Sequence, residues 1–124
     1  RDCLNYEAGK FQNVHYGDVL ITFPDVIDAA SPLLPYINED QTVTSEIFIE
    51  DGDIIVADTA EDETVGKCTE IVNVENSLIV SGLHTIPCRP NIFFEKGYLG
   101  HYMNSNAFHH RLRPLPLPKR ACFR

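Results

Sequence analysis

A glycine-aspartate pair followed by an unbroken apolar run lies at residues 50–57, which read EDGDIIVA. Gly52 can adopt the positive φ of a tight turn, and the Asp53 carboxylate can accept hydrogen bonds from nearby backbone in such a turn. The apolar residues that follow do not alternate with polar ones, which favours a strand buried on both faces. The segment therefore predicts a turn that opens a central β-strand.

The same pattern occurs earlier, at residues 15–22, which read HYGDVLIT. We expect a turn at Gly17-Asp18 and a strand within residues 14–23. Two interpretations remain open. The two segments are a repeated sequence pattern with a common structural meaning, or they are unrelated turns that happen to open two buried strands.

The remaining short apolar runs are separated by turn residues, which is typical of β-structure. They predict further strands at residues 46–49, 68–74, 78–80 and 83–89. In residues 68–74 the apolar members are expected to be Cys68, Ile71 and Val74. Residues 25–44 are expected to form a long acidic loop.

Residues 97–112 form the one good helical pattern, with Leu99, Tyr102, Met103 and Phe108 roughly on one face. The fold class predicted is α+β, with a twisted, partly barrel-like mixed β-sheet and one C-terminal helix. Prolines at every second position from residue 114 to residue 118 forbid helix and block sheet pairing. Residues 111–124 are therefore expected to be an extended, polyproline-like or disordered tail.

Composition is that of one globular domain: 124 residues, of which 44% are hydrophobic. No apolar run approaches the ~20 residues that span a bilayer, and no secretion signal is apparent, so we expect a cytoplasmic protein. The cysteines, at positions 3, 68, 88 and 122, are widely spaced and include no CxxC pair. Free thiols are expected rather than a zinc site.

Catalytic and metal chemistry have weak support in the sequence. Asp18, Asp53 and Asp58 could form a carboxylate set for metal or acid-base chemistry, but turn chemistry explains the first two more simply. The histidines at positions 101, 109 and 110 are badly spaced for joint ligation, since adjacent helical residues point about 100° apart. We expect no metal, no cofactor and no catalysis.

Charge is unevenly distributed along the chain. The formal net charge is −8, and residues 25–63 hold twelve acids and no lysine or arginine. Residues 111–124 hold five basic residues and no acid. Phosphate contacts supply most nonspecific DNA affinity, so any DNA binding by this chain alone is expected to be weak.

Five motifs in order resemble the target recognition domain of type I restriction-modification specificity subunits. They are HYGDVL at 15–20, GDIIVADTAED at 52–62, VGK at 65–67, SGLHTI at 81–86 and YLGHYMNS at 98–105. The resemblance implies a DNA-binding α+β domain that reads one half of a bipartite duplex site. In that family separate methyltransferase and restriction subunits carry out the chemistry, and the specificity subunit is not an enzyme.

The chain also departs from that family. No heptad run for the long spacer helices and no second recognition domain are present in the sequence, and residues 111–124 do not fit the family ending. We therefore expect residues 1–110 to be a partial recognition domain, followed by an unrelated tail from a truncated or frame-shifted product. An open sheet edge in such a piece would allow it to form a homodimer.

Candidate DNA-contacting residues are polar or basic side chains in the loops that join strands. They are Lys10, Asn13, His15, Tyr16, Thr59, Lys67, His84, Thr85 and Arg89. Arg89 is the leading candidate for a phosphate or guanine contact because its fork is bidentate. The structural alternative is that Tyr16 packs on the sheet, residues 59–67 form a solvated hairpin tip, and His84 is a core histidine.

Two other functions remain open. Glycine-aspartate followed by an apolar strand also occurs in peptidases with a serine-lysine pair, but Lys10, Lys67 and Lys96 lie in no matching motif. The acidic composition also suits an interaction or regulatory fragment that binds protein and not DNA.

Overall fold

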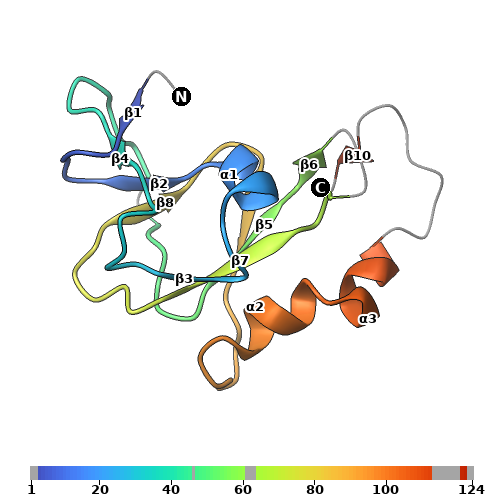
Figure 1. The fold of residues 1–124 in the computed structure, drawn as a ribbon. Helices are drawn as coiled ribbons and strands as arrows, with labels where there is room; N and C mark the ends of the chain where they lie inside the picture. The colour runs from blue at the N-terminus through green and yellow to red at the C-terminus, as the bar shows by residue number, and fades with distance from the viewer. Residues whose placement is uncertain (1–2, 46, 61–63, 113–120, 123–124) are drawn as a thin grey trace.

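A computed structural model describes residues 3–45, 47–60, 64–112 and 121–122. These residues form two four-stranded sheets, a two-stranded ribbon and three short α-helices (Figure 1). The mixed α+β prediction is confirmed. The prediction of one partly barrel-like sheet is wrong, because the strands divide between separate sheets and neither closes into a barrel within the described ranges.

The first sheet has the order β1-β4-β2-β8. Its strands are β1 Leu4–Asn5, β4 Tyr36–Ile37, β2 Gln12–Val14 and β8 Ile79–Ser81. β2 pairs with β4 in antiparallel fashion and with β8 in parallel, so this sheet is mixed. The β8 register confirms the strand expected near residues 78–80.

The second sheet has the order β3-β7-β5-β9. Its strands are β3 Val26–Asp28, β7 Cys68–Val72, β5 Ile54–Ala57 and β9 Thr85–Cys88. β5 pairs on both sides with antiparallel neighbours, which confirms the predicted central strand. The strands expected within 68–74 and 83–89 are also confirmed, with shorter bounds.

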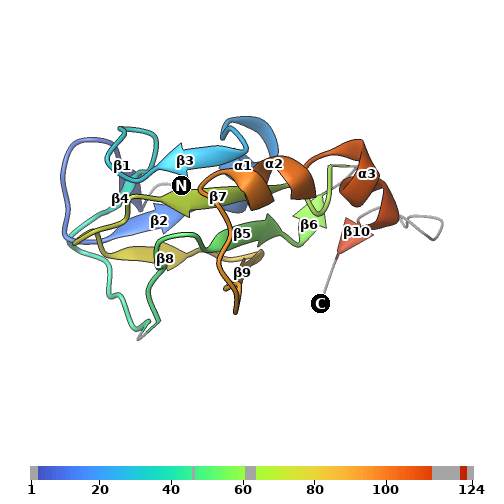
Figure 2. The same ribbon diagram turned by 90° about the horizontal axis from the view of Figure 1, so that it is seen from below.

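β7 differs from its prediction in burial. All five of its residues are buried, including the polar Thr69 and Glu70 and not only the predicted apolar ones. β7 lies between β3 and β5 in the sheet. Figure 2 shows α2 lying across this strand. A strand covered on both faces has no solvent side on which polar residues would alternate.

The two-stranded ribbon joins β6, Thr59–Ala60, to β10, Ala121–Cys122. The tail expected over residues 111–124 is therefore structured at this point. The prediction for the prolines falls on residues 113–120, which lie outside the described residues.

The strand predicted over residues 14–23 is wrong. β2 ends at Val14, and residues Tyr16–Ile21 form helix α1. The ring Nδ1 of His15 accepts a hydrogen bond from the Gly17 N–H at 3.1 Å and so caps the helix. Val19 and Phe23 are buried while Ile21 between them is 84% exposed, which does not fit the period of two that a strand would impose.

Two other element predictions are wrong. Residues 47–49 form no strand, and Glu46 lies outside the described residues. The loop expected over residues 25–44 contains β3 and β4, each of which pairs with a strand distant in sequence. Long-range pairing of this kind leaves little local pattern in the sequence.

The single C-terminal helix expected over residues 97–112 is broken. It consists of α2 Tyr98–Met103, α3 Asn106–His109 and a 3₁₀ turn His110–Leu112. The break falls at Asn104, whose side chain accepts from the Cys68 N–H at 2.9 Å and donates to the Cys68 carbonyl at 2.7 Å. These bonds fasten the end of α2 to β7.

Buried Glu70 fastens the start of α2. Its two carboxylate oxygens accept the N–H groups of Gly97 at 2.7 Å and Gly100 at 2.9 Å. A carboxylate is stabilising at a helix N-terminus, where backbone donors lack intrahelical partners. The helix is thus anchored to β7 at both ends.

The main core lies between α1 and the two sheets and is built from aliphatic side chains with one phenylalanine. Its buried members are Val14, Val19, Phe23, Ile27, Ala29, Leu34, Ile49, Ile55, Ala57, Ile71, Val74 and Ile79. Because both sheets and α1 contribute, the junctions between them are held rigidly.

Candidate nucleic-acid interface

Three chain segments meet beside α1: the β2–α1 junction, the β5–β6 junction and the β8–β9 turn. They bring together six of the nine predicted site residues, which we call the tip cluster. Its members are Asn13, His15, Tyr16, Thr59, His84 and Thr85.

Aromatic contacts connect two of these segments. The rings of His15 and Tyr16 stack with centroids 5.0 Å apart, and the ring of His84 meets Tyr16 edge-on at 5.4 Å. These separations are the ones that aromatic pairs prefer. Tyr16 therefore contacts two histidine rings, and its partly buried side chain also packs against the main core, in keeping with the structural alternative.

Polar groups of the β5–β6 junction contact the His84 ring and fix its position. Its Nδ1 lies 3.2 Å from the Thr59 hydroxyl and 3.5 Å from an oxygen of Asp58. The Thr59 hydroxyl donates to the same Asp58 oxygen at 2.8 Å. Thr59 and Asp58 are buried, so they form a fixed support for a partly exposed imidazole.

The backbone of His84 has φ of 59°, in the left-handed region. Non-glycine residues adopt this conformation at a cost, and such residues are concentrated at binding and catalytic sites. The Asp58 N–H donates to the His84 carbonyl at 3.0 Å, which helps hold this conformation. The turn thus presents the imidazole in a defined position.

Gly82 sets the approach of the β8–β9 turn to β2. Its N–H donates to the Val14 carbonyl at 3.0 Å, and an added Cβ would lie 2.5 Å from that oxygen. The same Cβ would lie 3.0 Å from the Asn13 side chain. Only glycine allows this contact, which places Asn13 beside the turn. The hydroxyl of Thr85 contacts the Ser81 hydroxyl and the Gly82 carbonyl and closes the turn.

An open hollow of about 340 Å³ adjoins the cluster. Asn13, His15 and Tyr16 line it, together with Leu83, which is 78% exposed. Among the described residues, no lysine or arginine lines this hollow. Its surface can offer amide and imidazole hydrogen bonds and apolar contact, but formal positive charge only when a histidine is protonated.

The three basic candidates lie apart from the cluster. The Lys10 ammonium lies over the Phe11 ring at 5.3 Å, on the segment before β2. Lys67 donates to the Leu20 carbonyl at 3.2 Å, where it stabilises the C-terminal end of α1.

Arg89 is engaged by acids of its own chain. Its guanidinium donates to both carboxylate oxygens of buried Asp53, at 2.9 Å and 2.8 Å, and lies 3.0 Å from Glu50. The hydrogen bond to Asp53 raises the pKa of Arg89. These contacts stabilise the turn at Gly52. A phosphate that bound Arg89 would have to compete with the carboxylates of Asp53 and Glu50.

The described residues do not form an evident metal site or an activated nucleophile. Among the described residues, no group of three or more His, Cys, Asp or Glu side chains could hold a metal ion. Burial raises the pKa of the Cys68 thiol to about 12, so it stays protonated at neutral pH. Cys3, Cys68 and Cys88 are free thiols.

The peptidase alternative gains no support from the lysines. Lys67 bonds to a backbone carbonyl and Lys96 to the Asn73 side chain. Neither of these contacts is with a serine.

Sequence reasoning missed two residues of the tip. Asp58 was weighed only as part of a carboxylate set, yet it supports His84. Its position directly after a buried strand was the available signal. For Leu83 there was no signal in the sequence beyond its position next to a glycine in a turn.

Scans against protein-family models, curated proteins and solved structures found no match to this chain. The resemblance to type I target recognition domains therefore remains a matter of the five motifs. Across the described residues, no helix is long and apolar enough to cross a membrane.

Proposed function

We propose that this chain is a sequence-reading DNA-binding module, of the kind found in type I restriction-modification specificity subunits, with the tip cluster as its contact surface. The observation that carries the proposal is convergence. Five polar or aromatic residues of the tip cluster, from two separate segments, lie together at one surface, and the sixth, Thr59, is buried and contacts His84.

The chemistry of the cluster suits base edges better than phosphates. Asn13 and Thr85 carry groups that pair with base edges in the major groove, and Leu83 can contact a thymine methyl group. The His15 Nδ1 accepts from Gly17 N–H, so the neutral ring carries its proton on Nε2, a donor for guanine N7 or O6. Phosphate affinity would come from other parts of a full assembly.

In this proposal the chain itself is not an enzyme. It reads half of a bipartite site in the cytoplasm and guides separate methyltransferase and restriction subunits. Binding by the isolated chain is expected to be no tighter than typical nonspecific binding, ~10⁻⁴–10⁻⁶ M, because the cluster has no lysine or arginine.

Fluorescence anisotropy with a random pool of duplex DNA, at low and at moderate salt, tests the proposal. On the duplex sequence that the selection experiment below enriches, we expect His84→Ala to weaken binding by about fivefold to a hundredfold, the equivalent of one lost base contact. Binding to the random pool should change little, because nonspecific affinity comes from phosphate contacts. The matched control is His101→Ala, an exposed histidine on α2. Equal behaviour of these two variants, or no binding by the parent chain at low salt, would refute the proposal.

A selection experiment separates base reading from charge attraction. Repeated capture from the random pool is expected to enrich a short sequence, and the His84→Ala chain is expected to enrich a different one or none. Recovery of an unenriched pool by the parent chain would contradict sequence reading.

A further inference from the structure

A hollow of about 350 Å³ lies on the face of the first sheet opposite the tip cluster, and we call it the Gln12 hollow. Gln12 and Tyr36 line it, whereas their neighbours Asn13 and Ile37 line the hollow beside the tip cluster. Adjacent residues of a strand point to opposite faces of a sheet, so the two hollows are on different faces. The volume falls within the ~300–1,000 Å³ range of small-molecule pockets.

Two polar groups of the Gln12 hollow lack protein partners. Gln12 is only 8% exposed, and its amide nitrogen donates to the Leu34 carbonyl at 3.3 Å. Its amide oxygen accepts no hydrogen bond from any residue that the structure describes. The buried hydroxyl oxygen of Ser31, which also lines the hollow, has no partner within the described ranges. Unpaired polar groups in mostly buried surroundings cost free energy, so both oxygens favour a ligand that donates hydrogen bonds.

The rim of the hollow carries an acid that is not neutralised. Glu7 is exposed and lines the hollow, and its carboxylate forms no ion pair with any described residue. Within the described part of the chain, no lysine, arginine or histidine lines the hollow. The formal charge at this site is therefore negative, which favours a cation and opposes an anion.

The turn that carries Glu7 is held in place before any ligand binds. The Asn5 side-chain oxygen accepts the N–H groups of Glu7 at 2.9 Å and of Ala8 at 3.0 Å. An added Cβ at Gly9 would lie 2.9 Å from the Cβ of Tyr36. Only glycine lets this turn approach β4 so closely, which fixes the wall of the hollow.

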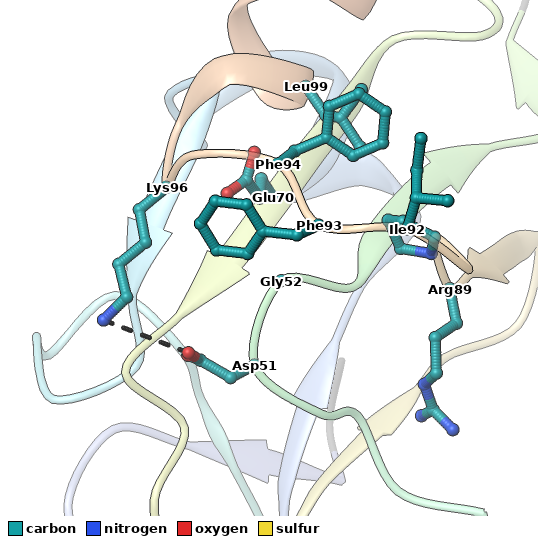
Figure 3. A pocket seen from close by; sticks show the side chains of 10 residues that line it. Asp51, Gly52, Glu70, Arg89, Ile92, Phe93, Phe94, Lys96 and Leu99 are labelled. Carbon is teal, nitrogen blue, oxygen red and sulfur yellow. Dashed lines mark ion pairs between the residues drawn. The ribbon is translucent and has the colours of Figure 1, made fainter.

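A second hollow, of about 230 Å³, differs in its charges. It is lined by charged residues of both signs, namely Asp51, Glu70, Arg89 and Lys96 (Figure 3). Glu70 already accepts two backbone N–H groups at the start of α2, and Lys96 lies 3.9 Å from Asp51. Arg89 is bound by buried Asp53. A charged ligand would have to displace these contacts, so this hollow serves as an internal comparison.

We propose that the Gln12 hollow binds a small organic cation, a protonated amine. Its ammonium group donates to the Gln12 amide oxygen and, after rotation about one bond, to the Ser31 hydroxyl. The Glu7 carboxylate supplies the opposite charge. The rings of Tyr6 and Tyr36 also line the hollow, and an aromatic face attracts a cation within about 6 Å.

Titrations of the full chain followed by backbone amide NMR shifts test the inference. The probes are benzylamine, benzyl alcohol and benzoate, which have similar shapes and different charges. We expect saturable shifts with benzylamine at Ser31 and Ser77, with a dissociation constant on the order of 1 mM, since the ligand has few atoms. The other two probes should bind at least about fivefold more weakly. The amide of Phe93, at the second hollow, should not shift.

Variants separate the role of Glu7 from that of overall charge. Glu7→Gln is expected to weaken benzylamine binding about fivefold and to leave benzyl alcohol binding unchanged. The matched control is Glu95→Gln, which removes the same charge at another exposed position and should change neither. Ser31→Ala should weaken benzylamine binding about threefold without loss of stability, because the hydroxyl it removes has no protein partner.

The inference is overturned by the absence of saturable shifts with benzylamine or by equal binding of benzylamine and benzoate. Equal losses in Glu7→Gln and Glu95→Gln would overturn it as well. Thermal unfolding of each variant confirms that it folds. The outcome is independent of the proposed DNA binding, because the Gln12 hollow and the tip cluster are on opposite faces of the sheet.

Discussion

The segments at residues 15–22 and 50–57 share a glycine-aspartate pair and an apolar continuation, yet they fold differently. Gly52 has φ of 87°, and the Asp53 carboxylate accepts the Glu50 N–H at 2.8 Å to close a turn before β5. Gly17 instead lies in the first turn of α1, capped by His15. The dipeptide alone therefore does not determine the turn.

The difference follows from what each segment packs against. β5 lies between β7 and β9 in its sheet, and three of its four residues, Ile54, Ile55 and Ala57, are buried. α1 has one buried face, so Val19 is fully buried while Ile21 is 84% exposed. One segment supports the sheet, and the other carries His15 and Tyr16 to the tip cluster.

The largest contrast is expected at the third residue after each glycine. Ile55→Ala should destabilise the fold by about 2–5 kcal/mol, because it leaves a cavity in the main core. Leu20→Ala should cost less than ~2 kcal/mol, because Leu20 is only partly buried. Urea unfolding of both variants checks this order, and equal losses would contradict it.

The aspartates give a second test. Asp53→Asn removes a charge that binds Arg89 and the Glu50 N–H. The expected loss is about 1.5–3 kcal/mol, as for hydrogen bonds to charged groups. Glu50→Gln serves as control, since it touches the same guanidinium from an exposed position and should change stability by less than ~0.5 kcal/mol. Similar losses in both variants would show that burial of Asp53 is not what matters.

Substitution of the two glycines is expected to change stability less than the substitutions above, and only one of the two should be costly. Gly52→Ala should cost about 1–2 kcal/mol, because an L side chain is strained at its positive φ even though the space is open. Gly17→Ala should change stability by less than ~0.5 kcal/mol, since a gain in helix propensity is offset by crowding of the His15 ring at 3.0 Å. Thermal unfolding of the pair measures both, and a costly Gly17→Ala would argue against α1.

The last test involves no substitution and measures how accessible strand β7, which pairs with β5, is to a reagent in solution. Burial raises the pKa of Cys68 to about 12, so its thiolate should be almost absent at pH values near 8. Exposed Cys3 should react with a thiol reagent in native protein, whereas Cys68 should react only after unfolding. Mass spectrometry of the labelled positions reads this directly, and rapid labelling of Cys68 would show that β7 opens.

Helical spacing in the first segment was available to sequence reasoning. Tyr16, Val19, Leu20 and Phe23 follow the i, i+3, i+4, i+7 pattern of an amphipathic helix. The likeness to residues 50–57 and the β-branched residues favoured a strand instead. β3 and β4 were less accessible, because each is defined by a partner far away in the sequence.

The candidate site was predictable in part. Glycine turns and polar loop residues selected six residues that the structure brings together, because loops after buried strands tend to meet at the ends of sheets, but they did not select Asp58 or Leu83. The same reasoning selected Arg89 because a guanidinium can bind phosphate or guanine. It could not show that the carboxylates of Asp53 and Glu50 already bind this guanidinium. Charge in a sequence does not reveal which charges are already neutralised by neighbours.

The sequence by itself determined the α+β class, the central strand β5 and the segments that become β7, β8 and β9, because short apolar runs bounded by turn residues are typical of strands. Only the tertiary structure decided that the strands divide into two sheets and that residues 16–21 become a helix. It also decided that His15, Tyr16 and His84 meet. The physical reason is that burial of one face, strand pairing and ring contacts depend on partners that are distant along the chain.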